Sequence, residues 1–357
     1  MSKVIVGMSG GVDSAVAALL LKEQGYEVVG VTLRTWVGDD GEDSRCCEID
    51  DARRVAWKLD IPYHVFNCVE EFREKVIDPF ICEYLSGRTP NPCVGCNRDI
   101  KWSRMLHYSE LLEADYIATG HYANIVKTDS GRYTVKKALH AEKDQTYMLY
   151  KLTQEQLKKT LMPLGNLKKS EVREMAAKAG LPIADKADSQ EICFVPDDNY
   201  TDFIRKNAKE EIPGEGLFID EEGKELGRHK GIIHYTVGQR KGLGLAMGVP
   251  VFVKEIDAEN NRVIIAKDEA LYVKRISCDE LNFLSIDDLE TGSSIRAYVK
   301  IRYHHKPQSA VLTRINDKEL EIEFDEPVRA ATPGQSTVFY DDRDRLIGGG
   351  VIRKSKV

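Results

Sequence analysis

Apolar and polar positions alternate in blocks over roughly the first 120 residues, with short apolar runs followed by longer amphipathic stretches. The runs predict strands and the stretches predict helices, and strands separated by helices pair in parallel. The expected strands are Lys3–Met8, Glu27–Arg34, Tyr63–Asn67 and Asp115–Thr119, and the expected helices are Ser14–Gln24, Glu48–Leu59, Glu70–Leu85 and Arg98–Leu112. This order predicts an α/β fold with a doubly wound parallel sheet, whose ligands bind at the carboxyl ends of its strands.

The pattern changes further along the chain. Tyr122–Leu139 predicts a hairpin that turns at Asp129-Ser130-Gly131, and Gln145–Leu152 and Lys169–Ala179 predict helices. Beyond about Arg205 short β-rich segments separated by glycine turns predominate: Gly216–Ile219, Val249–Ile256, Arg262–Ala266, Ser294–Ile301, Ser309–Ile315, Glu319–Phe324 and Ser336–Tyr340. We expect two small β domains, the last barrel-like, with domain boundaries at 1–205, 206–272 and 273–357.

Charge and hydropathy narrow the class of protein. The 357 residues carry 51 Lys and Arg against 58 Asp and Glu, a net charge of −7, so overall charge gives no sign of a nucleic-acid partner. Two stretches, Leu226–Lys254 and Ile295–Asn316, nevertheless lack acids and mix basic with aromatic side chains. They suit a nucleic-acid surface, or a solvated strand face whose acidic partners lie elsewhere. No window approaches the ~20 apolar residues of a membrane span, and the start does not resemble a signal peptide, so we expect a cytoplasmic protein without a membrane partner.

The first predicted strand runs directly into the sequence SGGVDS. Two adjacent glycines let the backbone turn sharply and approach a ligand, and the helix that follows presents free N–H groups to an anion. Asp13 beside phosphates requires a divalent cation between them. The loop predicts a pyrophosphate cradle for Mg-ATP, although an ordinary glycine-rich turn is the alternative. Its residues are Gly7, Met8, Ser9, Gly10, Gly11, Val12, Asp13 and Ser14.

Two of the cysteine-bearing segments are candidates for chemistry. In Thr89–Asn97 two prolines predict an extended loop up to Pro92, and a helix from about Arg98 would place Cys96 near a helix N-terminus, which favours the thiolate. Cys93 and Cys96 fit zinc ligands, a redox pair or a nucleophile with a neighbour; structural zinc is disfavoured because no second CxxC is present. Cys193, in the segment DSQEICFV, is by itself also typical of a buried strand cysteine.

SGGVDS, TPNPCVGCN and DSQEICF together resemble the tRNA-specific 2-thiouridylases of the PP-loop ATP pyrophosphatase superfamily, over essentially the whole chain. The resemblance implies an adenine nucleotide alpha hydrolase-like catalytic domain and a C-terminal tRNA-binding domain. It also implies ATP-dependent adenylation of the carbon 2 oxygen of the wobble uridine (position 34), then sulfur transfer, with release of AMP and pyrophosphate. The implied partners are the anticodon loop of tRNA and an upstream sulfur-carrier protein or cysteine desulfurase.

The resemblance also assigns roles to residues. Cys193 carries a persulfide, and Cys96 attacks it to leave a transient Cys96–Cys193 disulfide. Leu33 and Gly120 join Gly7–Ser14 in binding ATP. The residues implied to meet the target base or other parts of the tRNA are Asn91, Pro92, Cys93, His121, Lys143, Asp144, Gln145, Arg302, Tyr303 and Gln335.

One departure from the family and two rival functions remain open. Some members carry Asp where this chain has Cys93, so an iron–sulfur cluster on Cys93, Cys96 and Cys193 is an alternative sulfur carrier. The rivals are another PP-loop tRNA-modifying or amidating enzyme, and a non-catalytic RNA- or metal-binding protein; no glutaminase motif supports an amidase. The other cysteines, Cys46, Cys47, Cys68, Cys82 and Cys278, we expect to be structural.

Overall fold

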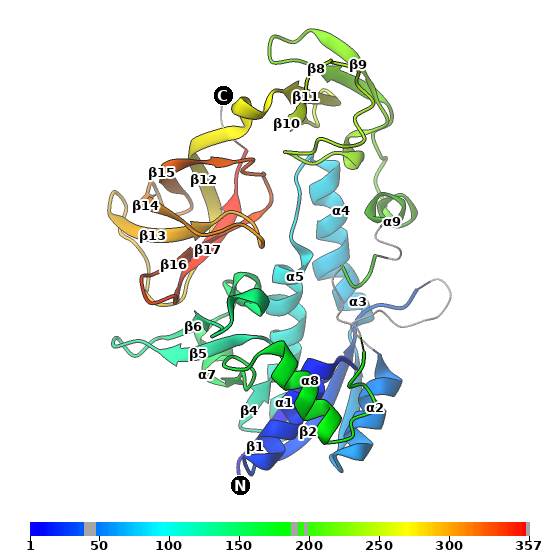
Figure 1. The fold of residues 1–357 in the computed structure, drawn as a ribbon, viewed down its shortest axis with the longest axis vertical. Helices are drawn as coiled ribbons and strands as arrows, with labels where there is room; N and C mark the ends of the chain where they lie inside the picture. The colour runs from blue at the N-terminus through cyan, green and yellow to red at the C-terminus, as the bar shows by residue number, and fades with distance from the viewer. Residues whose placement is uncertain (39–47, 187–191, 196–198, 355–357) are drawn as a thin grey trace. The chain divides into compact units, whose positions relative to one another are not determined.

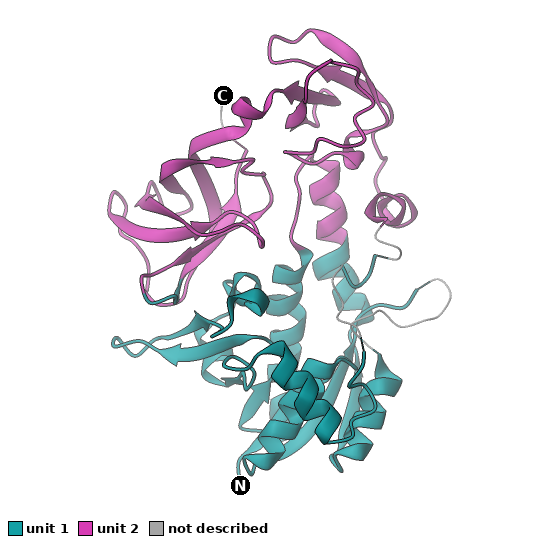
Figure 2. Ribbon diagram, in the orientation of Figure 1, with its two compact units in different colours: residues 1–77, 92–198, 343–346 teal, residues 78–91, 199–342, 347–357 magenta. Residues whose placement is uncertain are grey.

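The computed structural model describes residues 1–38, 48–186, 192–195 and 199–354. The chain divides into two compact units, shown in Figure 2. Unit 1 comprises residues 1–77, 92–198 and 343–346, and unit 2 comprises residues 78–91, 199–342 and 347–357. No helix of the described chain is both long enough and apolar enough to cross a membrane. The Cys46–Cys47 pair lies outside the described residues.

A parallel five-stranded sheet of order β3-β2-β1-β4-β7 forms the centre of unit 1 (Figure 1). Its strands are β1 (Lys3–Gly7), β2 (Glu27–Arg34), β3 (Tyr63–Asn67), β4 (Tyr116–Ala118) and β7 (Thr160–Leu161). The doubly wound parallel fold is confirmed, and the four predicted strands are present. Because β1 is flanked by β2 on one side and by β4 on the other, the strand order reverses at β1, where such sheets bind ligands.

Apolar packing explains why β1 is central. Val4, Ile5 and Val6 are fully buried, as expected for a strand covered on both faces. Helix α1 (Val12–Glu23) packs on β1 and β2 and against α8 (Lys169–Lys178), and its small buried residues, such as Ala17 and Ala18, allow close approach. Helix α2 (Ile49–Lys58) packs on β2 and β3.

Two long helical stretches follow one another here, and the second carries Cys93 and Cys96. The first is α3 (Val69–Phe72), η1 (Arg73–Ile77) and α4 (Asp78–Leu85), as predicted for Glu70–Leu85. The second begins earlier than predicted, with α5 (Pro92–Gly95), η2 (Cys96–Trp102) and α6 (Ser103–Leu111). A helix beginning at Arg98 was therefore wrong. Proline is tolerated in the first turn of a helix because its missing N–H would have no partner there.

The hairpin is present as β5 (Ala123–Lys127) and β6 (Tyr133–Lys137), paired antiparallel. The helix expected over Gln145–Leu152 was wrong: residues Ala141–Lys143 and Thr146–Leu149 form the 3-10 turns η3 and η4. A short helix α7 (Gln154–Lys158), which the pattern did not indicate, follows with a complete Thr153–Gln156 capping box.

Unit 2 contains helix α9 (Tyr200–Asn207) and two β structures. The smaller is a sheet of order β10-β11-β8-β9, formed by Phe252–Asp257, Arg262–Ala266, Gly216–Ile219 and Glu225–His229, with 3-10 turns η6 (Ile232–His234) and η7 (Asp268–Leu271). The larger is a closed antiparallel barrel of order β12-β15-β14-β13-β16-β17. Its strands are β12 (Tyr272–Phe283), β13 (Ser294–Lys300), β14 (Gln308–Arg314), β15 (Leu320–Arg329), β16 (Ser336–Tyr340) and β17 (Leu346–Ile352). The expected barrel-like end is confirmed; the domain boundaries remain predictions.

Candidate functional site

The loop after β1 folds into a tight, internally bonded turn. Gly10 has φ +80°, and a Cβ there would lie 2.6 Å from the Glu48 carbonyl oxygen, so glycine is required. The Ser14 hydroxyl accepts from the Ser9 backbone N–H (3.2 Å) and donates to the Gly11 carbonyl (3.0 Å). Gly11 is the N-cap of α1 and has no side chain to bond the first N–H groups of the helix. Those groups are the donors an anion would use.

The residues predicted to bind ATP come together at the carboxyl ends of three adjacent strands. The SGGVDS loop follows β1, Leu33 is the second-last residue of β2, and Gly120 follows β4. A Cβ on Gly120 would lie 2.6 Å from the backbone of Asp13 and Ser14, so the β4 loop touches the β1 loop directly. The structure thus brings the predicted ATP residues to one place in unit 1.

A lysine and a tyrosine that the sequence analysis missed hold the Asp13 carboxylate. Lys169 Nζ lies 2.7 and 2.8 Å from the two Asp13 carboxylate oxygens, and the Tyr122 hydroxyl donates to one of them at 2.8 Å. Lys169 is the first residue of α8, where the helix dipole disfavours a cation. A lysine placed against the dipole was the signal that could have indicated an acidic partner or ligand.

A second lysine, Lys186, contacts the same loop at Gly10. Lys186 pairs with Glu48 and Asp51 and lies 3.4 Å from the Gly10 carbonyl oxygen. Burial opposes its charge, but hydrogen bonds to the two carboxylates outweigh this and raise the pKa of Lys186.

The segments of Cys96 and Cys193 pack against the same helical stretch of unit 1. Phe194 meets Phe72 of α3 edge to face, with ring centroids 5.5 Å apart. α5 packs on η1, the continuation of α3. Cys193 is half-buried in a turn, not in a strand, and Cys96 is buried. Residues 188–191 of the DSQEICF motif lie outside the described residues.

The helix start at Pro92 changes how the two cysteines of CVGC are placed. Cys93 lies in the first helical turn and is exposed, whereas Cys96 lies one turn further in. The expectation that Cys96 sits near a helix N-terminus is therefore corrected. Cys96 and Cys193 are not joined by a disulfide. Across the described residues, no three His, Cys, Asp or Glu side chains are placed to hold a metal ion, and the iron–sulfur cluster on Cys93, Cys96 and Cys193 stays a prediction.

His121 lies next to Gly120 and is partly buried. Its Nδ1 is 2.8 Å from the Thr119 hydroxyl, and its ring centroid is 5.3 Å from that of Trp102. Burial, with a smaller contribution from Lys101, lowers the pKa of His121 to about 3. An uncharged imidazole at this position can exchange hydrogen bonds with a base but cannot pair with a phosphate as a cation.

The Lys143-Asp144-Gln145 segment is bonded into unit 1. The buried Asp144 carboxylate accepts from the Ala138 N–H (3.1 Å) and from the Thr146 hydroxyl (2.8 Å). The Gln145 side-chain oxygen accepts from the Tyr122 N–H at 2.9 Å. These contacts hold the segment in place, together with Tyr122, whose hydroxyl donates to Asp13. The contacts of this segment with tRNA stay predictions.

The remaining predicted residues belong to unit 2. Arg302 donates to the Arg329 carbonyl at 2.8 Å, and Lys300 Nζ lies 5.6 Å from the centroid of the Tyr303 ring. Gln335 donates to the carbonyl oxygens of Thr89 (2.9 Å) and Pro90 (3.3 Å), just before Asn91. Asn91 is itself the last residue of its segment of unit 2.

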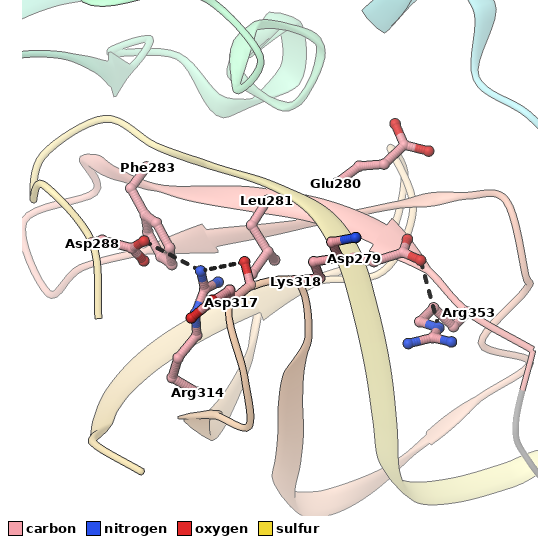
Figure 3. A pocket seen from close by; sticks show the side chains of 9 residues that line it. All are labelled: Asp279, Glu280, Leu281, Phe283, Asp288, Arg314, Asp317, Lys318 and Arg353. Carbon is pink, nitrogen blue, oxygen red and sulfur yellow. Dashed lines mark hydrogen bonds and ion pairs between the residues drawn. The ribbon is translucent and has the colours of Figure 1, made fainter. Parts of the chain in front are cut away.

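The barrel also carries a polar pocket (Figure 3) that includes none of the predicted site residues. In it, the buried Arg314 guanidinium lies 3.2 Å from an Asp288 carboxylate oxygen and donates to the Asp317 carbonyl at 2.9 Å. These contacts tie the loop after β12 to the turn after β14. The lining residues are Asp279, Glu280, Leu281, Phe283, Asp288, Arg314, Asp317, Lys318 and Arg353.

Comparison with known proteins identifies the family. Three family models match in succession: a tRNA methyl transferase HUP domain at residues 2–197, a tRNA methyl transferase PRC-barrel domain at 201–267, and an aminomethyltransferase beta-barrel domain at 273–352. The tRNA-specific 2-thiouridylase MnmA of Lachnoclostridium phytofermentans is 53% identical over 99% of this chain and 100% of its own length. The chain belongs to the tRNA-specific 2-thiouridylase family.

A further curated relative agrees with this assignment. The 2-thiouridylase MnmA of Clostridioides difficile is 50% identical over 99% of this chain and 98% of its own length. Among solved structures, a U34-tRNA thiolase from Methanococcus maripaludis with its [4Fe-4S] cluster is 21% identical and covers 58% of this chain and 67% of that one, with a TM-score of 0.36. Family membership implies the use of ATP, as the loop after β1 indicates.

Proposed function

We propose that this protein is a tRNA 2-thiouridine synthase, which replaces the carbon 2 oxygen of the wobble uridine with sulfur at the expense of ATP. The observation that supports this most is the placement, within unit 1, of the SGGVDS turn at the reversal point of the sheet, together with two cysteine segments packed on one helical stretch. A nucleotide site and a pair of thiols are the two components that the reaction needs.

ATP is needed because the oxygen of an amide-like carbonyl is a poor leaving group. The uridine oxygen attacks the α-phosphorus of ATP, pyrophosphate leaves, and the oxygen becomes part of an AMP ester. In our proposal, the N–H groups at the start of α1 and the Ser9 and Ser14 hydroxyls hold the phosphates. Asp13 meets Mg²⁺ when ATP binds, and Lys169, which now neutralises Asp13, then becomes available to a phosphate oxygen.

The thiols supply the sulfur and the electrons. The terminal sulfur of a persulfide on Cys193 attacks carbon 2, and AMP departs with the original oxygen. Cys96 attacks the Cys193 sulfur, so the transferred atom leaves at the oxidation level of sulfide, and the Cys96–Cys193 disulfide holds the two oxidised thiols until a reductant clears it. A sulfur-carrier protein or cysteine desulfurase charges Cys193, and the anticodon loop of tRNA is the second partner.

Nucleoside mass spectrometry of a wobble-uridine tRNA, after incubation with the protein, Mg-ATP and a persulfide donor, tests the proposal. We expect 2-thiouridine from the wild type and none from Cys193→Ser or Cys96→Ser. Cys278→Ser is the matched control, because Cys278 is fully buried in the barrel and burial raises its pKa, so that it stays a thiol. A wild type that forms no 2-thiouridine, or a Cys278→Ser variant as inactive as Cys193→Ser at equal folding, contradicts the proposal.

A further inference from the structure

Strand β3 is an open edge of the sheet in unit 1. It pairs with β2 on one side, and no strand of the described chain pairs with its other side. Cys68, directly after β3, donates its N–H to the Arg34 carbonyl of β2 at 2.8 Å. Because the backbone groups of successive strand residues alternate in direction, those of Asn67 and Val65 point to the open side. These N–H and C=O groups are placed to pair with a further strand.

The β3 edge lacks the charges, prolines and bulges that commonly keep edge strands from pairing. Its sequence, YHVFN, contains no lysine, acid or proline, and its register with β2 is continuous. Val65, at the middle of the strand, is 38% exposed. An unprotected edge of this kind indicates a surface at which another chain binds.

Aromatic and aliphatic side chains lie beside this edge. The Phe66 ring stacks on the Tyr108 ring of α6, with an angle of 7° between the ring planes. Leu111 lies one turn further along the same face of α6 and is 64% exposed, and His64 is exposed on β3. We call His64, Val65, Phe66, Tyr108 and Leu111 the β3 edge surface. Such a surface suits an extended peptide, which gains affinity from main-chain bonds and specificity from side-chain contacts.

The β3 edge surface lies close to the segment of Cys193. Cys68, which follows β3, is the N-cap of α3, and its carbonyl accepts from the Phe72 N–H at 2.9 Å. The Phe72 ring meets the ring of Phe194, the residue after Cys193, with centroids 5.5 Å apart. One turn of helix therefore separates the end of β3 from the neighbour of Cys193. All of these residues belong to unit 1.

We propose that the β3 edge surface is the docking site of the protein that donates a persulfide to Cys193, and that this donor adds an extended strand to β3. The inference rests on the proposed function. A protein donor must bring its own persulfide to the Cys193 thiol, so it has to bind unit 1 beside that residue. A second copy of this chain has no such reason to bind there.

The sulfur transfer that this docking permits is an exchange between two cysteines. The Cys193 thiolate attacks the terminal sulfur of the donor persulfide, and a sulfur–sulfur bond to Cys193 forms. The sulfur–sulfur bond of the donor breaks, and the donor cysteine leaves as a thiolate. The proton stays on the transferred sulfur, and there is no net oxidation or reduction.

Val65→Lys and Leu111→Lys test the inference, because a lysine on the edge surface opposes strand pairing. Leu139→Lys is the matched control: Leu139 is 68% exposed in the same unit but lies outside the β3 edge surface. The protein donor is the cysteine desulfurase of the same organism with cysteine, and inorganic polysulfide is the small donor. Mass spectrometry measures the persulfide on Cys193.

We expect the desulfurase to load Cys193 of Val65→Lys and Leu111→Lys about tenfold or more slowly than the wild type, through a higher KM for the desulfurase. Leu139→Lys should load at the wild-type rate. Polysulfide, which needs no docking surface, should load all four proteins alike, and this shows that the variants are folded and that Cys193 is intact.

Three results would overturn the inference. The first is equal loading of all four proteins by the desulfurase, and the second is a wild type that polysulfide loads but the desulfurase does not. The third is a molar mass, from light scattering, that Val65→Lys reduces to half the wild-type value, since the surface would then join two copies of the chain. Loading requires neither tRNA nor ATP. A wild type that the desulfurase loads but that forms no 2-thiouridine refutes the proposed function and leaves the docking site in place.

Discussion

The Asp13 carboxylate lies at the turn where we propose that the phosphates of ATP bind, and its neighbours explain why the fold tolerates it. Lys169 and Tyr122 bond the carboxylate in the absence of a nucleotide, and Lys186 pairs with Glu48 and Asp51 on the other side of the same turn. The loop is therefore surrounded by cations that already have acidic partners. In our proposal, Mg-ATP would replace these ion pairs by new ones without leaving an unpaired charge.

Gly120→Ala should impair ATP binding by distorting the phosphate turn. Its Cβ would lie 2.6 Å from the backbone of Asp13 and Ser14, which cannot move aside as a flexible side chain would. We expect a loss of stability of about 1–3 kcal/mol, and ATP affinity weaker by more than the stability change explains. Calorimetric titration with Mg-ATP and denaturant unfolding measure the two effects.

Gly214→Ala is the matched control for that substitution, because a Cβ at Gly214 meets no atom within 4 Å. Equal ATP affinity in the two variants would contradict the close contact between the β1 and β4 loops.

His121 should make the protein less stable in mild acid. Its pKa is about 3 in the folded protein against 6.5 for an ordinary histidine, because burial disfavours the charged ring. The unfolded chain therefore binds more protons between these values, and the stability contribution is present above the unfolded pKa and decreases as pH falls below it. Between about pH 7 and about pH 5.5, the wild type should lose about 1 kcal/mol more than His121→Gln in urea unfolding. An equal loss in both proteins would show that His121 is charged in the folded state.

At the scale of elements, hydrophobic periodicity predicted the parallel sheet, the hairpin and most barrel strands. Hydrophobic periodicity failed where proline or glycine residues determine the local backbone conformation. Pro92 suggested a loop but begins a helix, and β17 was missed because its sequence, LIGGGVI, contains three consecutive glycines, which have low strand propensity. A Cβ on Gly348 would lie 2.2 Å from the Asn282 carbonyl oxygen, so close approach to β12 requires this glycine.

The same limit applies to the site. SGGVDS and the two cysteine motifs could be recognised because the chemistry depends on their local sequence. Lys169 and Tyr122 bond Asp13 across 156 and 109 positions of the chain, and Thr89 bonds Gln335 across 246 positions. No local sequence pattern encodes contacts over such separations. Gln335 was found by resemblance, and its side-chain bonds to Thr89 and Pro90 are known only from the structure.

For the molecule as a whole, an acidic chain with a net charge of −7 must bind an acidic tRNA. The repulsion between the two is reduced if basic residues are concentrated on the surface that binds tRNA. The acid-free stretch Ile295–Asn316 is such a concentration of basic residues in the sequence. Arg302 and Tyr303 stand in this stretch, shortly after the end of β13.

Replacing Arg302 with Gln should weaken tRNA binding several-fold and reduce the slope of log K against log salt by about one, as expected for one lost phosphate contact. Arg275→Gln, which removes an exposed arginine that pairs with Glu323 on β12 and β15, is the control and should leave the slope unchanged. Filter binding over a salt series gives both slopes. Equal slopes for Arg302→Gln and the wild type would place Arg302 outside the tRNA interface.

In the proposed mechanism, ATP activates the carbon 2 oxygen of the wobble uridine, so that this oxygen leaves as part of AMP. A tRNA whose wobble uridine carries oxygen-18 at carbon 2 tests it directly, with the released AMP analysed by mass spectrometry during thiolation. We predict that AMP gains one heavy oxygen for each 2-thiouridine formed. AMP without the label, while 2-thiouridine still accumulates, would show that the oxygen leaves by another route and would contradict the adenylation mechanism.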